Sequence, residues 1–117
     1  MKRIELEERL IDFSVRIIEI ATALKRTKAG RILEDQIVRS GTSCALNYGE
    51  AIGAESTKDF IHKIQVVLKE LRETFIALRI IKKSGLSKSP EELTSGLDEN
   101  NQLISIFVKS VYSNKNR

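Results

Sequence analysis

Residues 56–85 read STKDFIHKIQVVLKELRETFIALRIIKKSG, and this segment predicts one long amphipathic helix. Its apolar or small side chains recur every three or four residues, which places them on one helical face. They are Phe60, Ile64, Val67, Leu71, Thr74, Leu78 and Ile81. Ser56 followed by Asp59 is close to a capping box, and Gly85 is a natural C-terminal stop. The sequence therefore predicts a helix over residues 57–84.

The rest of the chain repeats this pattern on both sides. The same periodicity predicts helices over residues 4–25, 31–52 and 90–112. Ser89 and Pro90 form a strong helix start, while the polar segment 113–117 is expected to fray. Short connections make consecutive helices antiparallel neighbours. We therefore expect an all-α, antiparallel up-down four-helix bundle in which residues 1–117 form a single domain.

The composition limits the class of protein. The chain has 117 residues, 41% hydrophobic and 31% charged, which suits one folded domain. No apolar run approaches the length of about 18 residues that a transmembrane helix needs. The acidic, amphipathic N-terminus does not resemble a signal peptide, so a cytoplasmic location is expected. Cys44 is the single cysteine and lies among apolar helical positions, so we expect it to be buried rather than reactive.

The sequence offers no pattern for catalysis. One histidine and one cysteine, far apart in the sequence, do not make a metal-ligand set. Ser43 and His62 have no third group that would complete a nucleophilic site, and neither a phosphate-binding loop nor a dinucleotide fingerprint is present. We therefore predict a non-enzymatic protein with no metal, no cofactor and no identified small-molecule substrate.

A polar stripe follows one face of the second predicted helix, bordering its buried seam. Its members are Gln36, Arg39 or Ser40, Ser43, Asn47 and Glu50. These groups could be half-buried and hydrogen-bond to neighbouring helices, fixing register or assembly. Alternatively, the stripe could bind a ligand or form a subunit interface. The spacing alone leaves both readings open.

A line of basic residues runs along the outer face of the third helix. Its cations are Lys58, Lys69, Arg72, Arg79 and Lys83. The chain has 20 basic and 16 acidic residues, and segment 57–85, with seven and three of these, can account for the whole net charge of +4. Such a line is often a solvated face, but its field also suits a phosphate backbone. No aromatic residue interleaves with the cations, so base stacking is not expected.

The polar stripe also carries a family resemblance. Gln36-Ile-Val-Arg39-Ser-Gly-Thr-Ser43-Cys-Ala-Leu-Asn47-Tyr-Gly-Glu50 resembles the signature Q-[IL]-x-R-[AS]-x-x-S-[IV]-x-x-N-I-x-E-G. That signature belongs to the four-helix-bundle family encoded in intervening sequences of bacterial 23S ribosomal RNA genes. Residues 56–61 are similar to the family's S-x-x-[ED]-F-I start of helix three. Glu50 is followed by Ala51 rather than the family's glycine, which marks a divergent member.

The resemblance implies a bacterial, cytoplasmic bundle that assembles as a homopentameric ring. The accessory proteins of diversity-generating retroelements are related, similar in fold, and bind nucleic acid through a basic surface. We therefore predict a homo-oligomeric accessory protein that binds RNA or DNA, with RNA favoured, through the basic line of helix three. Arg39 is a weaker candidate contact, because Glu50 or a neighbouring subunit could hold it. The alternative is a structural or adaptor ring that docks a larger protein.

Overall fold

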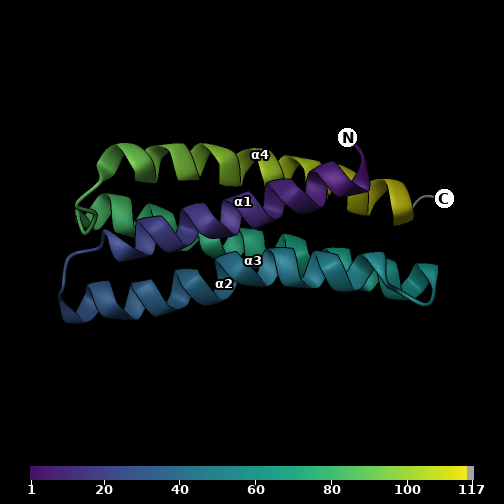
Figure 1. Cartoon of the computed structure of the whole chain (residues 1–117), viewed down its shortest axis with the longest axis horizontal. Helices are drawn as coiled ribbons and strands as arrows, with labels where there is room; N and C mark the ends of the chain where they lie inside the picture. Colours follow the sequence, from purple (N-terminus) through teal and green to yellow (C-terminus); the bar gives the residue numbers. More distant parts are fainter. Residues whose placement is uncertain (116–117) are drawn as a thin grey trace.

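The computed structural model describes residues 1–115 and confirms the all-α class, with four helices and no strand in this range. The helices are α1 (Arg3–Thr22), α2 (Lys28–Ile52), α3 (Thr57–Ser84) and α4 (Pro90–Lys115). They run back and forth along a rod of 46 × 21 × 20 Å, as Figure 1 shows. Each helix packs on the next, and α4 returns to α1, so the contacts are those of an up-down bundle.

Helix boundaries follow the local capping signals, with three differences from the sequence prediction. The first helix ends at Thr22 rather than at residue 25, and the second begins at Lys28 rather than at residue 31. Thr27, expected to belong to a break, is the N-cap of α2 and accepts a hydrogen bond from the Gly30 amide. α4 continues to Lys115, so residues 113–115 are helical rather than frayed; residues 116–117 lie outside the described range.

The third helix has the ends that its sequence predicts. The Ser56 side chain accepts a hydrogen bond from the Asp59 amide at 3.1 Å, which satisfies one of the free donors of the first turn. Gly85 ends the helix in the left-handed region, at φ 67°, where a side chain would be strained. The register of α3 is therefore fixed at both ends.

The middle of the bundle is a close contact of small and hydroxyl side chains from α1, α2 and α3, which we call the central junction. A Cβ atom on Gly41 would lie 2.7 Å from Cγ2 of Ile17, so α1 and α2 approach too closely for any larger residue. Ser14 on α1 donates to the Gly41 carbonyl at 3.1 Å. Thr74 on α3 lies 2.8 Å from the Ser40 hydroxyl, and both side chains are fully buried. These contacts align the three helices.

The two connections at the opposite end from the chain termini are tied together. An antiparallel bridge joins Leu24 and Ser87. The Lys25 amide donates to the Leu86 carbonyl, and the Lys88 amide donates to the Ala23 carbonyl, both at 2.8 Å. The α1–α2 and α3–α4 connections therefore form one surface, seen at the left of Figure 1.

Candidate nucleic-acid interface

The basic line predicted from the sequence lies on the surface of α3, and all five of its cations are exposed. The five do not form one patch. Lys58 lies in the first turn of α3, near the chain termini, and Lys83 lies in the last turn, about 38 Å further along at 1.5 Å per residue. Exposed Ile76 and Ile80 lie on the same side of the helix, so its outer face is part basic and part apolar.

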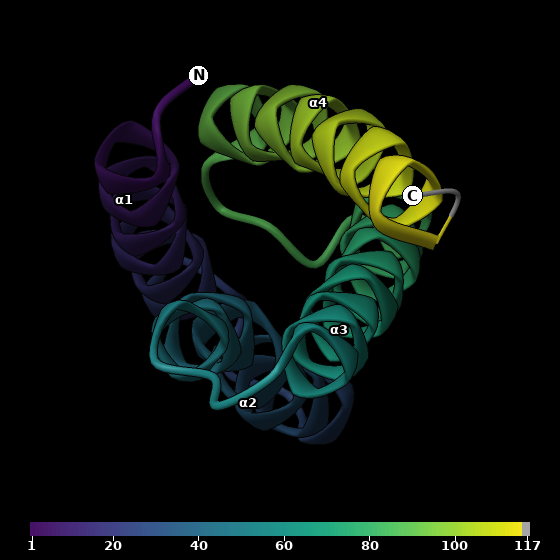
Figure 2. The ribbon, with the colours of Figure 1, turned by 90° about the vertical axis from the view of Figure 1, so that its right-hand side faces the viewer.

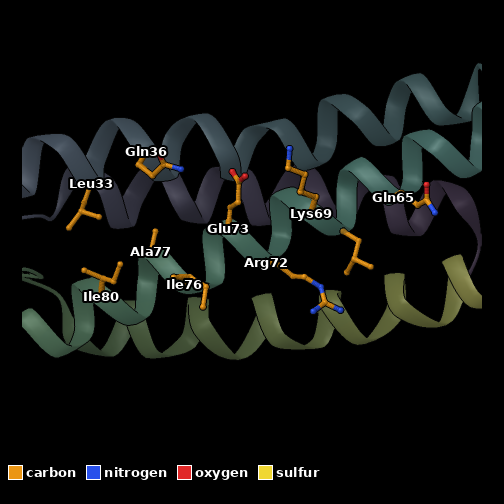
Figure 3. A pocket seen from close by; sticks show the side chains of 10 residues that line it. Leu33, Gln36, Gln65, Lys69, Arg72, Glu73, Ile76, Ala77 and Ile80 are labelled. Atoms are coloured by element: carbon orange, nitrogen blue, oxygen red, sulfur yellow. The ribbon is translucent and has the colours of Figure 1, made fainter.

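A shallow groove of about 690 Å³ runs between α2 and α3, and Figure 3 shows its lining. We refer to it as the α2–α3 groove. Its lining residues are Leu33, Gln36, Gln65, Leu68, Lys69, Arg72, Glu73, Ile76, Ala77 and Ile80. Lys69 and Glu73 rise toward α2, while Arg72 and Ile76 point toward α4 (Figure 3). Two of the five predicted contacts, Lys69 and Arg72, are thus rim residues of an apolar groove.

The polar stripe of α2 divides into separate contacts. Arg39 lies 3.3 Å from a Glu73 oxygen and 3.7 Å from one of Glu70, both on α3. The prediction that Glu50 could hold Arg39 is therefore wrong within this chain, because Glu50 pairs with Lys63 instead, at 3.3 Å. The helical period explains this, since residues 39 and 50 lie three turns apart along α2.

The remaining members of the stripe make local contacts. The Asn47 amide donates to the Ser43 hydroxyl at 2.8 Å and to the Ser43 carbonyl at 2.9 Å, both on α2 itself. Gln36 lines the α2–α3 groove. Ser40, the alternative member at the second position, is the one that enters the core and contacts Thr74. One of the two alternatives for the stripe was that its side chains bond to neighbouring helices. Ser40 does so through a hydrogen bond to Thr74, and Arg39 and Glu50 do so through ion pairs with α3.

Seven cations gather where the two tied connections meet, a surface that we call the basic end. They are Lys25, Arg26, Lys28, Arg31, Lys82, Lys83 and Lys88. All seven are exposed, and none takes part in an ion pair that the structure records within residues 1–115. Segments 23–31 and 82–89, which hold them, contain no Asp or Glu. Because the whole chain carries +4, these two segments carry +7 against a net −3 in the rest of the sequence, and Glu34 is an acidic neighbour that lines a small hollow with Lys25, Arg26 and Arg31.

Counting charges segment by segment along the sequence did not reveal most of the basic end. Lys25, Arg26 and Lys28 follow a helix that carries five acidic residues, so residues 1–28 seemed nearly balanced. The structure separates these cations from the acids by placing them beyond the end of α1. A signal was available in the sequence, since two connections of an up-down bundle that share an end must lie near each other.

An aromatic ring lies beside the basic end, contrary to the sequence prediction. The guanidinium of Arg79 stands 6.0 Å from the centre of the Phe75 ring. Both residues line a hollow of about 500 Å³ between α3 and α4, together with Lys82, Lys83, Leu97, Asp98 and Asn101. Cations and an accessible ring in one hollow are the elements of a stacking site for an unpaired base.

Three buried groups, Cys44, Tyr48 and Glu70, have raised pKa values, and burial is the largest cause for each. Burial raises the pKa of the Cys44 thiol to about 12, so this thiol stays protonated at neutral pH. Burial, with the neighbouring charge of Glu73, raises the pKa of Glu70, although Arg39 partly offsets this. Within residues 1–115, no three His, Cys, Asp or Glu side chains come together as a metal site would require.

Comparisons with known proteins agree with this architecture. A family model described as 23S rRNA-intervening sequence protein matches residues 2–109. A crystal structure of a protein of unknown function from the S23 ribosomal protein family of Bacteroides thetaiotaomicron superposes with a TM-score of 0.83 and 27% identity. The match covers 96% of this chain and 99% of that one. No curated protein matches the chain. Among the described residues, no helix is long and apolar enough to cross a membrane.

Proposed function

The chain belongs to the family of 23S rRNA-intervening sequence proteins, and from this premise we propose that it is a non-enzymatic accessory protein that binds nucleic acid. In this proposal the ligand is RNA in preference to DNA, the protein acts in the cytoplasm, and it works as a homo-oligomer, a pentameric ring by family resemblance. The basic end is the observation that carries the proposal.

The charge of the basic end supports binding to a phosphate backbone. Seven exposed cations without recorded ion-pair partners produce a local positive field, whereas the rest of the chain is net acidic. Neutralised phosphates release counterions, which drives association and makes affinity fall steeply with salt. Of the residues predicted from the sequence, Arg79 and Lys83 join this surface, and Lys58 lies at the far end of α3.

The preference for RNA is supported by the hollow around Phe75. Specific RNA recognition favours unpaired bases that stack on aromatic side chains or guanidinium planes. The Arg79–Phe75 pair offers both surfaces, flanked by Lys82 and Lys83. A single-stranded loop could thus place a base in this hollow while its phosphates contact the basic end.

A structural or adaptor role is the second candidate, and the α2–α3 groove favours it. Ile76 and Ile80 are 51% and 50% exposed there and lie one helical turn apart, so together they form an apolar patch that a protein partner could cover. In this case a ring would dock a larger protein, and nucleic acid would not be its principal ligand.

The decisive experiment measures binding of structured RNA, single-stranded RNA and duplex DNA over a range of salt concentrations. A basic-end variant, Arg26→Gln/Lys28→Gln/Lys83→Gln, should weaken binding about tenfold or more at low salt. It should also reduce the slope of log affinity against log salt by about two for single strands. The matched control removes three exposed cations near the chain termini, Lys2→Gln/Lys109→Gln/Lys115→Gln, and should change little.

The same titrations can contradict the proposal. Absence of binding to all three nucleic acids at low salt would refute it and leave the adaptor role. Equal losses in the basic-end and control variants would show that binding follows net charge rather than this surface. A Phe75→Leu variant should weaken binding to single-stranded RNA more than binding to duplex DNA if the hollow holds a base.

A further inference from the structure

The outward face of α1 is apolar without being covered. Ile4, Ile11, Val15 and Ile18 are between 40% and 76% exposed, and they follow one another at seven-, four- and three-residue steps. We call this set the α1 stripe. Helical geometry places such residues on one side. The large apolar residues that α1 uses within the bundle lie on its other side and are buried.

Acidic side chains accompany the α1 stripe. Glu8, Asp12 and Glu19 are exposed on this outward face, and none forms an ion pair that the structure records in residues 1–115. The basic residues in the middle of α1 lie on its other side, where Arg9 pairs with Glu99 of α4 and Arg16 donates to Ser95. The outward face of α1 is therefore apolar and negative.

The α2–α3 groove has the opposite character. Its lining includes exposed Ile76 and Ile80 and the exposed cations Lys69 and Arg72, which form no ion pair that the structure records in residues 1–115, whereas the acidic lining residue Glu73 pairs with Arg39. The groove is thus apolar and carries two unpaired positive charges. One molecule presents both halves of a complementary contact.

We propose that the α1 stripe of one copy packs into the α2–α3 groove of a second copy. The inference rests on the proposed function only in taking the protein to be a homo-oligomer; it needs no nucleic acid. Because α1 and α3 lie diagonally across the bundle, with α2 and α4 between them (Figure 2), a molecule cannot satisfy its own groove.

The central junction shows that the two faces lie at the same height along the rod. Adjacent residues of α2 contact Ser14 on α1 and Thr74 on α3, through Gly41 and Ser40 respectively. α1 and α3 run parallel, since one antiparallel helix separates them, so equal steps from Ser14 and Thr74 reach equal heights. Asp12 lies two residues before Ser14 and Arg72 lies two residues before Thr74, so the two side chains are at the same height.

The remaining residues follow the same register. Glu8 lies six residues before Ser14, and Lys69 lies five residues before Thr74. Ile18 lies four residues after Ser14, between the heights of Ile76 and Ile80, which are two and six residues after Thr74. Acid thus faces cation, and apolar faces apolar, without any shift along the axis.

The absence of an axial shift determines the kind of assembly. A contact between two different faces of identical subunits forms a ring only when repeated rotation closes, whereas a translation along the axis produces an open filament. Matching heights mean that rotation about an axis parallel to the rod is enough. The matching heights therefore remove the axial translation that would produce a helical filament, and a ring that covers every α1 stripe and every groove forms when the rotation also closes.

A charge swap tests the contact through self-association alone, which is measured without nucleic acid. Asp12→Lys and Arg72→Glu each place like charges in contact and should weaken self-association about tenfold or more, measured by light scattering without nucleic acid. The double variant should restore assembly to near the wild-type level. Glu91→Lys and Lys109→Glu, which reverse exposed charges on α4, are the matched controls and should leave assembly unchanged.

Cysteine pairs provide a second test that survives if a charge variant fails to fold. Cys44 is fully buried, so new thiols supply the only accessible ones. Val15→Cys and Ile76→Cys, two positions with the same 51% exposure, should form an intermolecular disulfide when the two variants are mixed. Neither variant should link to itself, and the double variant should give a covalent closed ring.

Several results would overturn this assembly. Self-linking of Val15→Cys alone would show a symmetric α1–α1 contact. An oligomer that is indifferent to both charge reversals would refute the interface while leaving homo-oligomerisation intact. A wild-type protein that stays monomeric would refute both, but would leave nucleic-acid binding at the basic end untouched. Loss of RNA binding by a monomeric Arg72→Glu variant would assign the groove to RNA instead.

Discussion

The central junction and the basic end differ in almost every physical respect. The junction is buried and tightly packed, with Ser40 and Thr74 fully buried and Gly41 against Ile17. The basic end is solvated, and its seven cations make no recorded ion pair within residues 1–115. One region holds the helices in register, and the other concentrates the charge. Stability and binding should therefore respond to different substitutions.

The largest loss of stability is expected from Gly41→Ala. The new Cβ would lie 2.7 Å from Cγ2 and 3.1 Å from Cβ of Ile17, a branched stem that cannot rotate away. Overpacking of this kind costs about 1–3 kcal/mol in the free energy of unfolding, which urea denaturation measures.

Gly49→Ala is the matched control for this prediction, because it lies on the same helix and nothing stands within 4 Å of its Cβ position. It should stabilise the protein by up to about 1 kcal/mol through helix propensity. Equal effects at the two glycines would show that α1 and α2 do not approach as closely as the junction requires.

A smaller loss is expected when the junction loses its hydroxyl contact. Thr74→Val keeps the volume but removes a group that lies 2.8 Å from both the Ser40 hydroxyl and the Glu70 carbonyl. Leaving Ser40 with one fewer partner in the core should cost about 1–2 kcal/mol by urea denaturation. Thr94→Val, which removes an exposed intrahelical bond on α4, should cost much less. A neutral Thr74→Val would mean that the contact does not contribute to register.

The junction was partly predicted from the sequence, whereas the basic end was not, although the up-down topology offered a signal for it. Helical periodicity predicted the apolar seams and placed a polar stripe beside Gly41, because these depend on residues within one or two turns. Ser40 lies three residues after Ile37 and four before Cys44, so the period places it, rather than Arg39, beside the buried seam; the sequence prediction left the two as alternatives. The partners of Arg39 and Glu50 also depend on how far α3 slides along α2, which no local pattern encodes.

The basic end escaped prediction for a different reason. Lys25 and Lys88 are 63 positions apart in the sequence, and the bridge between Leu24 and Ser87 brings their segments together. A count of charges along the sequence cannot show that two distant segments lie side by side. Arg79 and Phe75 are four residues apart on α3 and so share a face, but the hollow that both line depends on the packing of α3 against α4.

A third prediction concerns Glu70 at the rim of the junction, where a substitution should raise the free energy of unfolding rather than lower it. Burial raises the pKa of Glu70 above its ordinary value of 4.5, and its Oε2 atom has no hydrogen-bond partner. As pH rises above 4.5, the unfolded chain loses this proton first, so the native state loses stability until Glu70 itself ionises. Glu70→Gln should remove this decline and be more stable than the wild type at neutral pH.

The comparison for Glu70 is made across pH. Urea denaturation of the two proteins should give converging stabilities below pH 4.5 and a gap in favour of Glu70→Gln at neutral pH. Glu50→Gln is a suitable control, because its carboxylate is 58% exposed and pairs with Lys63 rather than with Arg39. A variant that is less stable than the wild type at neutral pH would show that the attraction to Arg39 outweighs the cost of burial.

The smallest effect on stability is expected at the basic end, where removal of charge should impair binding and leave the fold intact. In the Arg26→Gln/Lys28→Gln/Lys83→Gln variant, the three altered side chains are exposed and have no recorded ion-pair partner in residues 1–115. Surface substitutions of this kind usually change the free energy of unfolding by less than about 0.5 kcal/mol.

Two small effects on stability also oppose each other in this variant. Relief of repulsion among the remaining cations is stabilising, whereas loss of Lys83 from the last turn of α3, where a positive charge complements the helix dipole, is destabilising. Thermal and urea unfolding should therefore match the wild type while affinity for RNA falls. A loss above about 1 kcal/mol would instead make these cations part of the scaffold, and the contrast between the two regions would no longer hold.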